Sequence, residues 1–213
     1  QATNLPPSYK YERQHGDQGD GIYIRDGVSF PKLFNIETVN LQAYQAQLIR
    51  WITFNILVRN YDAHGKNISF FVGKNGLELT PFYDLVNIEA IIEQAGIDCV
   101  KGGSKLAISR HYAMSLGDYN SQGAGNFSNE ITAYMLADFA DEFDISLARM
   151  QLLMSQTIQS VLAAITMAKA TAIANNLSNS ELEHIGLCIN IINKAAGELS
   201  EQVELLPSMK AFI

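Results

Sequence analysis

Four polar side chains that can do chemistry stand together in the segment NYDAHGKNISFF, just before an apolar run: Asp62, His64, Lys66 and Asn67. A fifth, Asp84, follows 17 residues after Asn67. A carboxylate can accept the proton of a nucleophile, while an amide oxygen and a second carboxylate are ligands that Mg²⁺ takes beside phosphate. Asp62, Asn67 and Asp84 therefore have the chemistry of a site that transfers a phosphoryl group from ATP.

The spacing of these residues follows a known pattern. An aspartate, an asparagine five residues later and a metal-binding aspartate after a short hairpin make up the protein-kinase catalytic loop. The flanking letters differ here, since NYD replaces His-Arg-Asp and YDL replaces Asp-Phe-Gly. Each residue also has a structural explanation: Asp62 as a turn residue after a helix, Asn67 as a partner for loop backbone, and Asp84 as a strand-end cap. Their joint occurrence favours the functional interpretation.

Three nearby side chains bear on the same site. His64 stands two residues after Asp62, where kinase loops often carry a basic side chain that reaches the transferring phosphate. We therefore predict that His64 contacts phosphate or nucleotide. Tyr83 either contacts the nucleotide or packs in the interior, and the sequence does not choose between the two. Lys66 is predicted to be a solvated surface lysine.

The elements around the loop explain how these residues would meet. Apolar residues recur at three- and four-residue steps over residues 37–59, which predicts a helix with one buried face. Residues 67–72 and 77–85 favour strands, and GKNG between them is a turn signal, so we expect a hairpin. A hairpin folds the chain back on itself and would bring Asp84 close to Asn67.

The rest of the chain predicts a mainly α fold with this small β-hairpin. Residues 1–36, rich in glycine, proline and polar side chains, read as an extended lead-in to a helical domain over 37–213 with its loop and hairpin at 60–85. Residues 101–127 read as a long surface excursion around a strand-like KLAIS. Three further helices are expected, at residues 128–142, 146–175 and 180–197, the last preceded by a capping box in SNSE.

Composition narrows the function classes. The chain has 213 residues, 47% of them hydrophobic, and a net charge of −7, which suits a folded domain and argues against direct nucleic-acid binding. Its two cysteines, Cys99 and Cys188, form no metal or redox motif, and no uninterrupted apolar run is long enough to cross a bilayer. We expect a cytoplasmic protein. Because the sequence begins with Gln1 rather than Met, we also expect a fragment or a processed piece.

The segment NYDAHGKNISFF, followed by LELTPFYDLV, resembles the C-terminal part of HipA-type serine/threonine kinases. These kinases are the toxin component of HipBA-like toxin–antitoxin systems. The DxHxKN core combined with LTPFYD is specific to that family, and the lead-in LPPSYKYE…GDGI and KLAIS extend the likeness to about Ala172. The helix-forming tail after it adds no motif.

The resemblance implies the C-terminal lobe of a protein-kinase-like fold. It implies that Asp62 is the catalytic base and that Asn67 and Asp84 hold Mg²⁺. It further implies that ATP is the phosphate donor and that a protein serine is the acceptor. Aminoacyl-tRNA synthetases are among the targets of family members, and the implied partner is a helix-turn-helix antitoxin that binds operator DNA.

The sequence departs from the family in lacking an ATP-gripping N-terminal lobe. It shows no glycine-rich loop on a hairpin and no strand lysine paired with a helix glutamate, and GDQGDG at residues 16–21 has no adjacent lysine, serine or threonine. We therefore expect this piece alone to bind ATP poorly. Two alternatives stay open: a small-molecule or lipid kinase lobe, and a non-catalytic interaction module that binds an antitoxin.

Overall fold

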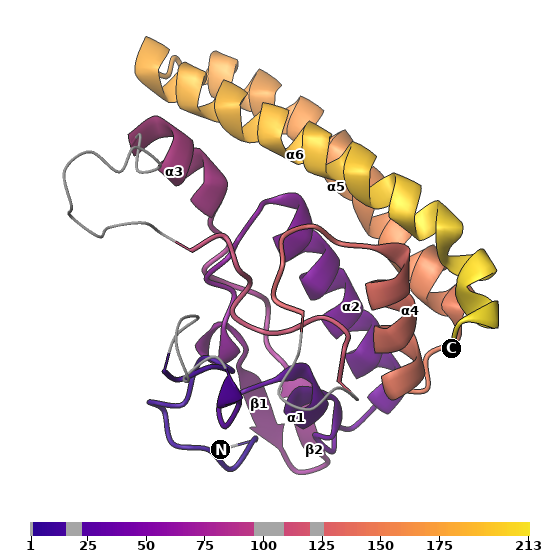
Figure 1. The fold of residues 1–213 in the computed structure, drawn as a ribbon. Coiled ribbons are helices and arrows are strands. Elements are labelled where there is room, and N and C mark those ends of the chain that lie inside the picture. Colours follow the sequence, from indigo (N-terminus) through magenta and orange to yellow (C-terminus); the bar gives the residue numbers. More distant parts are fainter. Residues whose placement is uncertain (1, 16–22, 96–108, 120–125) are drawn as a thin grey trace.

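The computed structural model describes residues 2–15, 23–95, 109–119 and 126–213. Within them the fold is mainly helical with one two-stranded antiparallel hairpin, so the predicted fold class is confirmed (Figure 1). The strands are β1 (Phe70–Gly73) and β2 (Gly76–Leu79). The helices are α1 (Phe30–Phe34), α2 (Leu41–Leu57), α3 (Ile88–Ala95), α4 (Ala133–Glu142), α5 (Leu147–Ala174) and α6 (Asn179–Leu205).

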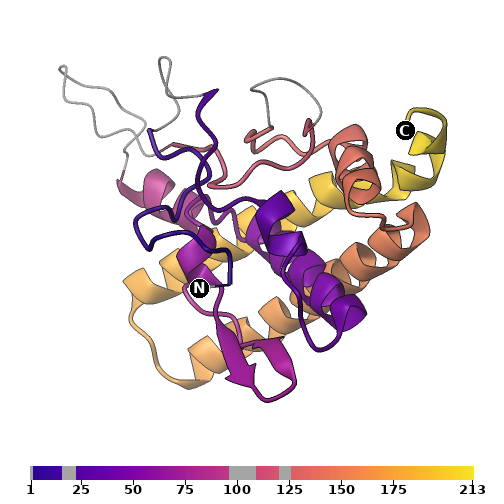
Figure 2. The same ribbon diagram turned by 90° about the horizontal axis from the view of Figure 1, so that it is seen from below.

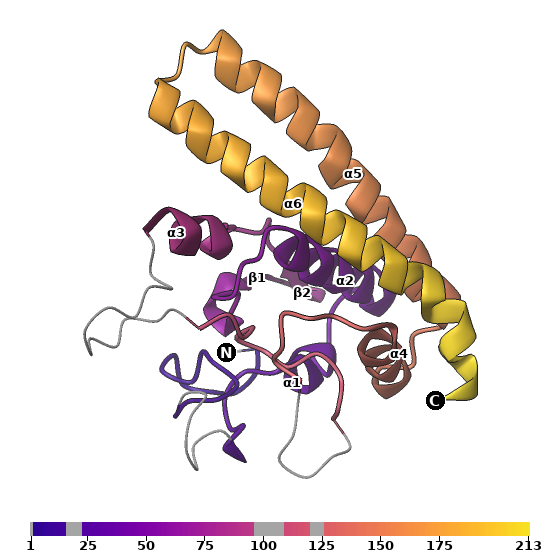
Figure 3. The ribbon, with the colours of Figure 1, turned by 45° about the horizontal axis from the view of Figure 1, so that its top comes forward.

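The core is built around α2, which lies between the N-terminal segment and the long pair α5 and α6 (Figure 3). The side chain of Asn40 caps this helix by accepting a hydrogen bond from the backbone N–H of Ala43. The helix predicted over residues 37–59 is therefore observed with shorter ends. Leu48 and Leu57 are fully buried along it, and its C-terminal end delivers the chain into the candidate loop.

Helices α5 and α6 run antiparallel along one face and extend past the rest of the molecule (Figures 1 and 3). Both begin after a serine cap, and the cap of α6 is the capping box that the sequence predicts. The side chain of Ser146 accepts a hydrogen bond from the backbone N–H of Arg149, and Ser178 forms a capping box with Glu181. The prediction for α5 is confirmed, whereas α6 continues to Leu205, beyond the end predicted from the sequence.

By length and composition alone, α5 is the one helix of the described residues that could cross a membrane. Its most apolar stretch has a mean hydropathy of 1.3. One such helix is weak evidence for a membrane span, because a core helix of a globular protein passes the same test. The packing of α5 against α2 and α6 gives part of its apolar surface a partner inside the molecule.

The hairpin lies where the sequence predicts it. Gly73 pairs with Gly76 across the turn, and Gly76 has a φ of +125°, a conformation that other residues rarely adopt. The backbone N–H of Val39 donates to the carbonyl oxygen of Leu77 at 3.1 Å, which ties the hairpin to the segment before α2. Figure 2 shows the hairpin and the N-terminal segment near one another, beside α2.

Both strands are shorter than the predicted ranges 67–72 and 77–85. The last hydrogen bond between the two segments runs from the N–H of Thr80 to the carbonyl oxygen of Ser69, at 3.0 Å. Regular pairing stops before the next residue, Pro81, a residue type that sheets accommodate only at strand ends, edges and bulges. The stretch that leads to the second aspartate is therefore irregular.

The N-terminal segment, predicted to be extended over residues 1–36, contains α1. Pro31 stands in its first turn, a position that proline tolerates well. Phe30 and Phe34 are buried, and both rings make edge contacts with Phe139 of α4, at centroid distances of 5.6 and 5.4 Å. The extended prediction is wrong here because aromatic burial fixes a helix too short for periodicity to reveal. A domain division near residue 36 stays a prediction.

The segment before α4 also differs from the prediction of a surface excursion over 101–127. Tyr112, Met114 and Leu116 are only 9%, 2% and 3% exposed. The surface prediction is wrong for these residues, because apolar side chains alternate through an otherwise polar stretch. KLAIS falls almost wholly outside the described residues, as does the glycine cluster at 16–21.

Helix α4 confirms the predicted helix over 128–142, with a later start. The side-chain oxygen of Thr132 accepts a hydrogen bond from the N–H of Met135 and so sets the first turn. The buried face of α4 joins the same core as α1 and α5. The aromatic contacts of α4 thereby hold the N-terminal segment close to the end of α2.

Candidate active site

The candidate loop, which comprises residues 60–67, begins shortly after the end of α2. Arg59 has a φ of +50°, and this left-handed residue turns the chain away from the helix. Asn60, only 2% exposed, then donates from Nδ2 to the side-chain oxygen of Asn55 at 2.9 Å and to the carbonyl oxygen of Asp84 at 3.1 Å. One buried amide thus holds the end of α2 and the backbone of Asp84 together.

The structure brings Asn67 and Asp84 into contact, as the hairpin prediction requires. Nδ2 of Asn67 donates to Oδ2 of Asp84 at 2.6 Å, and Oδ1 of Asn67 accepts from the backbone N–H of His64 at 2.8 Å. Because Oδ1 faces a backbone donor, the orientation of the amide is fixed by its partners. Asn67 is 3% exposed, whereas the Asp84 side chain faces solvent. The side chains of Asn67 and Asp84 therefore meet at the mouth of the loop, with the amide nitrogen facing the carboxylate and the amide oxygen facing the His64 N–H.

Asp62 lies on the same loop with its side chain exposed. Its Oδ1 accepts a hydrogen bond of 2.7 Å from the hydroxyl of Tyr11, a residue of the N-terminal segment. Partial burial, together with the hydrogen bond to Asp62, raises the pKa of Tyr11 well above its usual value, so the phenol stays protonated and donates. Tyr11 engages one carboxylate oxygen and leaves the other to receive a proton.

His64 is only 5% exposed, and its Nε2 lies 2.8 Å from Nζ of Lys10. Burial lowers the pKa of His64, and the nearby charge of Lys10 lowers it further, while Asp62 opposes the shift. The ring also stands edge-on to the ring of Tyr11, with centroids 5.0 Å apart. The predicted phosphate-contact residue is therefore enclosed by two side chains of the N-terminal segment.

Tyr83 ties the hairpin to the loop. Its hydroxyl lies 2.7 Å from Oγ of Ser69 and hydrogen-bonds to the carbonyl oxygen of Lys66, while 43% of the residue is exposed. The structure thus shows a tethering role for the hydroxyl, and a nucleotide contact stays a prediction. The side chain of Lys66 is exposed, as the sequence predicts.

Residues 9–12, which we call the strap, lie against the loop through backbone contacts. The N–H of Gly65 donates to the carbonyl oxygen of Lys10 at 2.9 Å, and the N–H of Val28 donates to that of Tyr9 at 3.1 Å. A Cβ on Gly65 would come within 2.6 Å of the Cβ of Val28. Glycine is therefore required for the loop to approach Val28, the residue that hydrogen-bonds to the strap, this closely.

Glu12 fixes the other end of the strap. Its carboxylate, 2% exposed, accepts hydrogen bonds from the N–H of Ser115 at 2.7 Å and from the hydroxyl of Ser115 at 2.9 Å. Arg25 lies 3.8 Å away. Burial raises the pKa of Glu12, against the opposing effects of the Ser115 hydrogen bonds and of Arg25. A buried carboxylate so fully engaged acts as an anchor for the strap.

The sequence alone does not mark Lys10, Tyr11 or Glu12 as site residues. Their one signal was that SYKYE belongs to the stretch on which the family resemblance depends. No local periodicity links them to a loop more than 50 residues away in the sequence. Their contacts with the loop became visible only in three dimensions.

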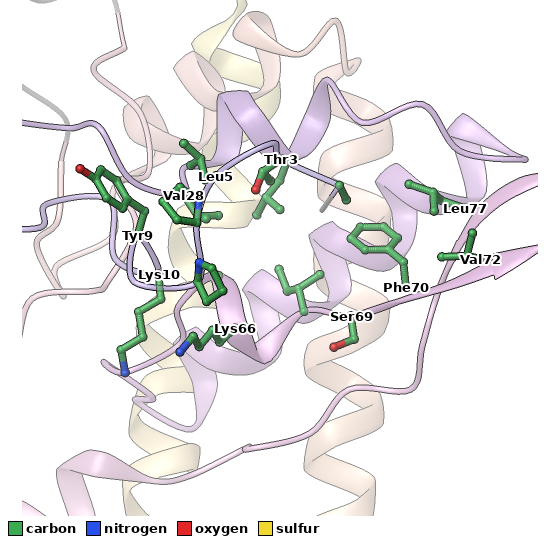
Figure 4. A pocket seen from close by; sticks show the side chains of 16 residues that line it. Thr3, Leu5, Tyr9, Lys10, Val28, Lys66, Ser69, Phe70, Val72 and Leu77 are labelled. Carbon is green, nitrogen blue, oxygen red and sulfur yellow. The ribbon is translucent and has the colours of Figure 1, made fainter.

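Two cavities flank the loop. One, of about 640 Å³, is mostly apolar and has Lys10 and Lys66 at one end (Figure 4). The other, of about 540 Å³, opens beside Asp62 and is lined by aromatic and polar side chains that include Tyr61 and His111. The second cavity thus gives space for a group that reacts at Asp62, while the first lies on the side of Gly65 and Lys66.

The donor set fits Mg²⁺ in the way that kinases hold it. The described residues contain no group of three or more histidine, cysteine, aspartate or glutamate side chains that could hold a metal by themselves. Magnesium keeps most of its waters and takes one or two protein carboxylates, the remaining ligands being phosphate oxygens. Asp84 with the amide oxygen of Asn67 meets that requirement, and the carbonyl oxygen keeps a second lone pair beside its bond to the His64 N–H.

Comparisons with known proteins show which family the chain resembles. Residues 1–168 match the family model of the HipA-like C-terminal domain. The serine/threonine-protein kinase toxin HipA of Shewanella oneidensis is 36% identical over 143 residues, which are 66% of this chain and 28% of that protein. A solved complex of HipA, HipB and operator DNA from Shewanella oneidensis contains a chain that matches with a TM-score of 0.80 and 26% identity, over 97% of this chain and 44% of that one. The chain spans less than half the length of both relatives.

Proposed function

We infer, because this chain belongs to the HipA-like C-terminal domain family, that it is the catalytic C-terminal lobe of an ATP-dependent serine/threonine-protein kinase, the toxin of a toxin–antitoxin system. One observation carries the proposal: the 2.6 Å contact between Asn67 and Asp84, on a loop that also presents Asp62. A scaffold without catalysis has no need for all three side chains in one place.

In the proposed reaction, Asp62 accepts the proton of a substrate serine hydroxyl as its oxygen attacks the γ-phosphorus of ATP. The bond from phosphorus to the bridging oxygen breaks, and ADP leaves. Tyr11 holds Asp62 through Oδ1, so that the carboxylate is oriented before the substrate arrives. Asn67 and Asp84 would hold Mg²⁺, which neutralises charge on the phosphate oxygens when it is bound.

The partners follow by analogy with the relatives. The HipA of Shewanella oneidensis was solved with HipB and operator DNA, and we propose a comparable helix-turn-helix antitoxin for this protein. The substrate would be a protein serine, with an aminoacyl-tRNA synthetase as the family analogue, in the cytoplasm. We further propose that a separate N-terminal lobe supplies the clamp for ATP, so that residues 1–213 alone bind the nucleotide weakly.

The test is Asp62→Asn in the complete kinase, measured as transfer of labelled γ-phosphate to protein. Asparagine keeps the shape of the side chain but cannot take the proton, and we expect transfer to fall by about 10²- to 10⁴-fold. Asp62 is exposed, so the thermal unfolding midpoint should stay close to that of the parent. Full transfer by the variant would refute the assignment of Asp62, and transfer to small molecules alone would favour the lipid or metabolite kinase alternative.

A further inference from the structure

We propose that Lys10 carries the positive charge that meets the terminal phosphate of ATP, with His64 holding its ammonium group in place. The inference rests on the proposed kinase function and names a phosphate-binding residue that the catalytic loop itself does not contain. It also changes the role predicted for His64, which becomes the support of the cation that contacts phosphate.

The geometry of the pair determines which atom donates. An ammonium group has three N–H donors and no acceptor, so across the 2.8 Å contact Lys10 donates and Nε2 of His64 accepts. This hydrogen bond uses one of the three donors and holds the ammonium group beside His64, which stands two residues after Asp62. Kinase loops place a basic side chain at that position. Here the histidine occupies the position in the sequence, and the charge comes from another segment of the chain.

The negative charges that meet at the site favour a cation among them. Asp62 and Asp84 are both acidic, and a triphosphate adds several further negative charges to the same small volume. A fixed cation lowers the cost of bringing these charges together and stabilises the phosphoryl group during transfer. Figure 4 shows the side chains of Lys10 and Lys66 reaching the same end of the cavity. Of these two, Lys10 is the lysine held by a partner on the catalytic loop.

The backbone of Lys10 is fixed to the loop that it would serve. Its carbonyl oxygen accepts from the N–H of Gly65, and Glu12, two residues later, is anchored to Ser115 inside the fold. A lysine on a free terminus would lose most of its side-chain and backbone entropy on binding phosphate. Because the strap already holds the backbone of Lys10, much of this entropy is lost before phosphate binds. Such preorganisation favours tight contact with phosphate in the transition state.

The test uses the complete kinase with Lys10→Met, which keeps the apolar stem and removes the charge. Lys74→Met is the matched control, because Lys74 is exposed in the turn of the hairpin and lines neither cavity beside the loop. We expect Lys10→Met to lower phosphoryl transfer by about 10- to 100-fold, the usual effect of losing a hydrogen bond between charged groups. Titration calorimetry should show weaker binding of Mg-ATP with little change for ADP, because only ATP has the terminal phosphate. Lys10→Arg should recover part of both, and Lys74→Met should resemble the parent.

The outcomes separate the two proposals. If the parent transfers phosphate and Lys10→Met behaves like the parent and Lys74→Met, Lys10 is not a phosphate contact, and the kinase function stands. If Lys10→Met loses ATP and ADP binding equally, or if Lys10→Arg recovers nothing, the lysine has a structural role only and the inference is wrong. If the parent itself neither binds ATP nor transfers phosphate, the kinase proposal fails and the inference fails with it.

Discussion

Glu12 offers a direct measure of how firmly the strap is held. Glu12→Ala removes the acceptor for the N–H and the hydroxyl of Ser115, a residue with no exposed surface. Each buried donor left without a partner costs about 1–3 kcal/mol. Removal of the carboxylate also relieves its own burial penalty, so we expect a net loss of about 2–3 kcal/mol in the free energy of unfolding. Strap displacement should lower phosphoryl transfer as well, since Lys10 and Tyr11 move with it.

The dependence on pH provides a second test of the same residue. Burial raises the pKa of Glu12 in the folded protein above its ordinary value of 4.5. The folded state therefore binds the Glu12 proton more tightly than the unfolded state does. The stability that this proton contributes is fully present below pH 4.5 and is lost as pH rises through the folded-state pKa. Glu12→Gln keeps the side-chain volume and one acceptor oxygen but does not titrate. We expect the stability of Glu12→Gln relative to the parent to increase as pH rises.

Urea unfolding followed by the fluorescence of Trp51 measures both effects, because Trp51 is the single tryptophan and is 2% exposed. The series needs the parent, Glu12→Ala and Glu12→Gln at several values between about pH 5 and about pH 8. A loss below about 1 kcal/mol for Glu12→Ala would show that Ser115 finds other partners. A parent that gains stability over Glu12→Gln with rising pH would show that hydrogen bonds to the carboxylate outweigh its burial.

Two further substitutions test contacts of the loop, one with Tyr11 of the strap and one with Val28. Tyr11→Phe removes the 2.7 Å hydrogen bond to Asp62, and we expect kcat to fall by about 3- to 10-fold with little change in KM for ATP. Steady-state phosphoryl transfer measures both constants, and an unchanged kcat would exclude a positioning role for Tyr11. Gly65→Ala places a Cβ 2.6 Å from that of Val28, so we expect a loss of about 1–3 kcal/mol in thermal or urea unfolding. The double variant with Val28→Ala should recover part of that loss, and no recovery would assign the cost to the backbone of the loop.

Local signals in the sequence predicted most of the regular elements. The starts of α5 and α6 follow from Ser146 and from the capping box at Ser178, because the partners of a helix cap lie within three residues. The contact between Asn67 and Asp84 also follows, since a hairpin brings its two ends together with a closure of only 17 residues. The strand lengths did not follow, since regular pairing stops before Pro81, and α1 did not follow, because aromatic packing sets that short helix.

The sequence by itself thus determined the fold class, the starts of α5 and α6 and the meeting of an amide with a carboxylate, since the caps and the hairpin depend on neighbours along the chain. Only the tertiary structure decided what surrounds them. Lys10 reaches His64 across 54 residues, and Glu12 reaches Ser115 across 103. Contacts at such separations leave no periodic trace in the sequence, because they depend on how the whole core places the strap above the loop.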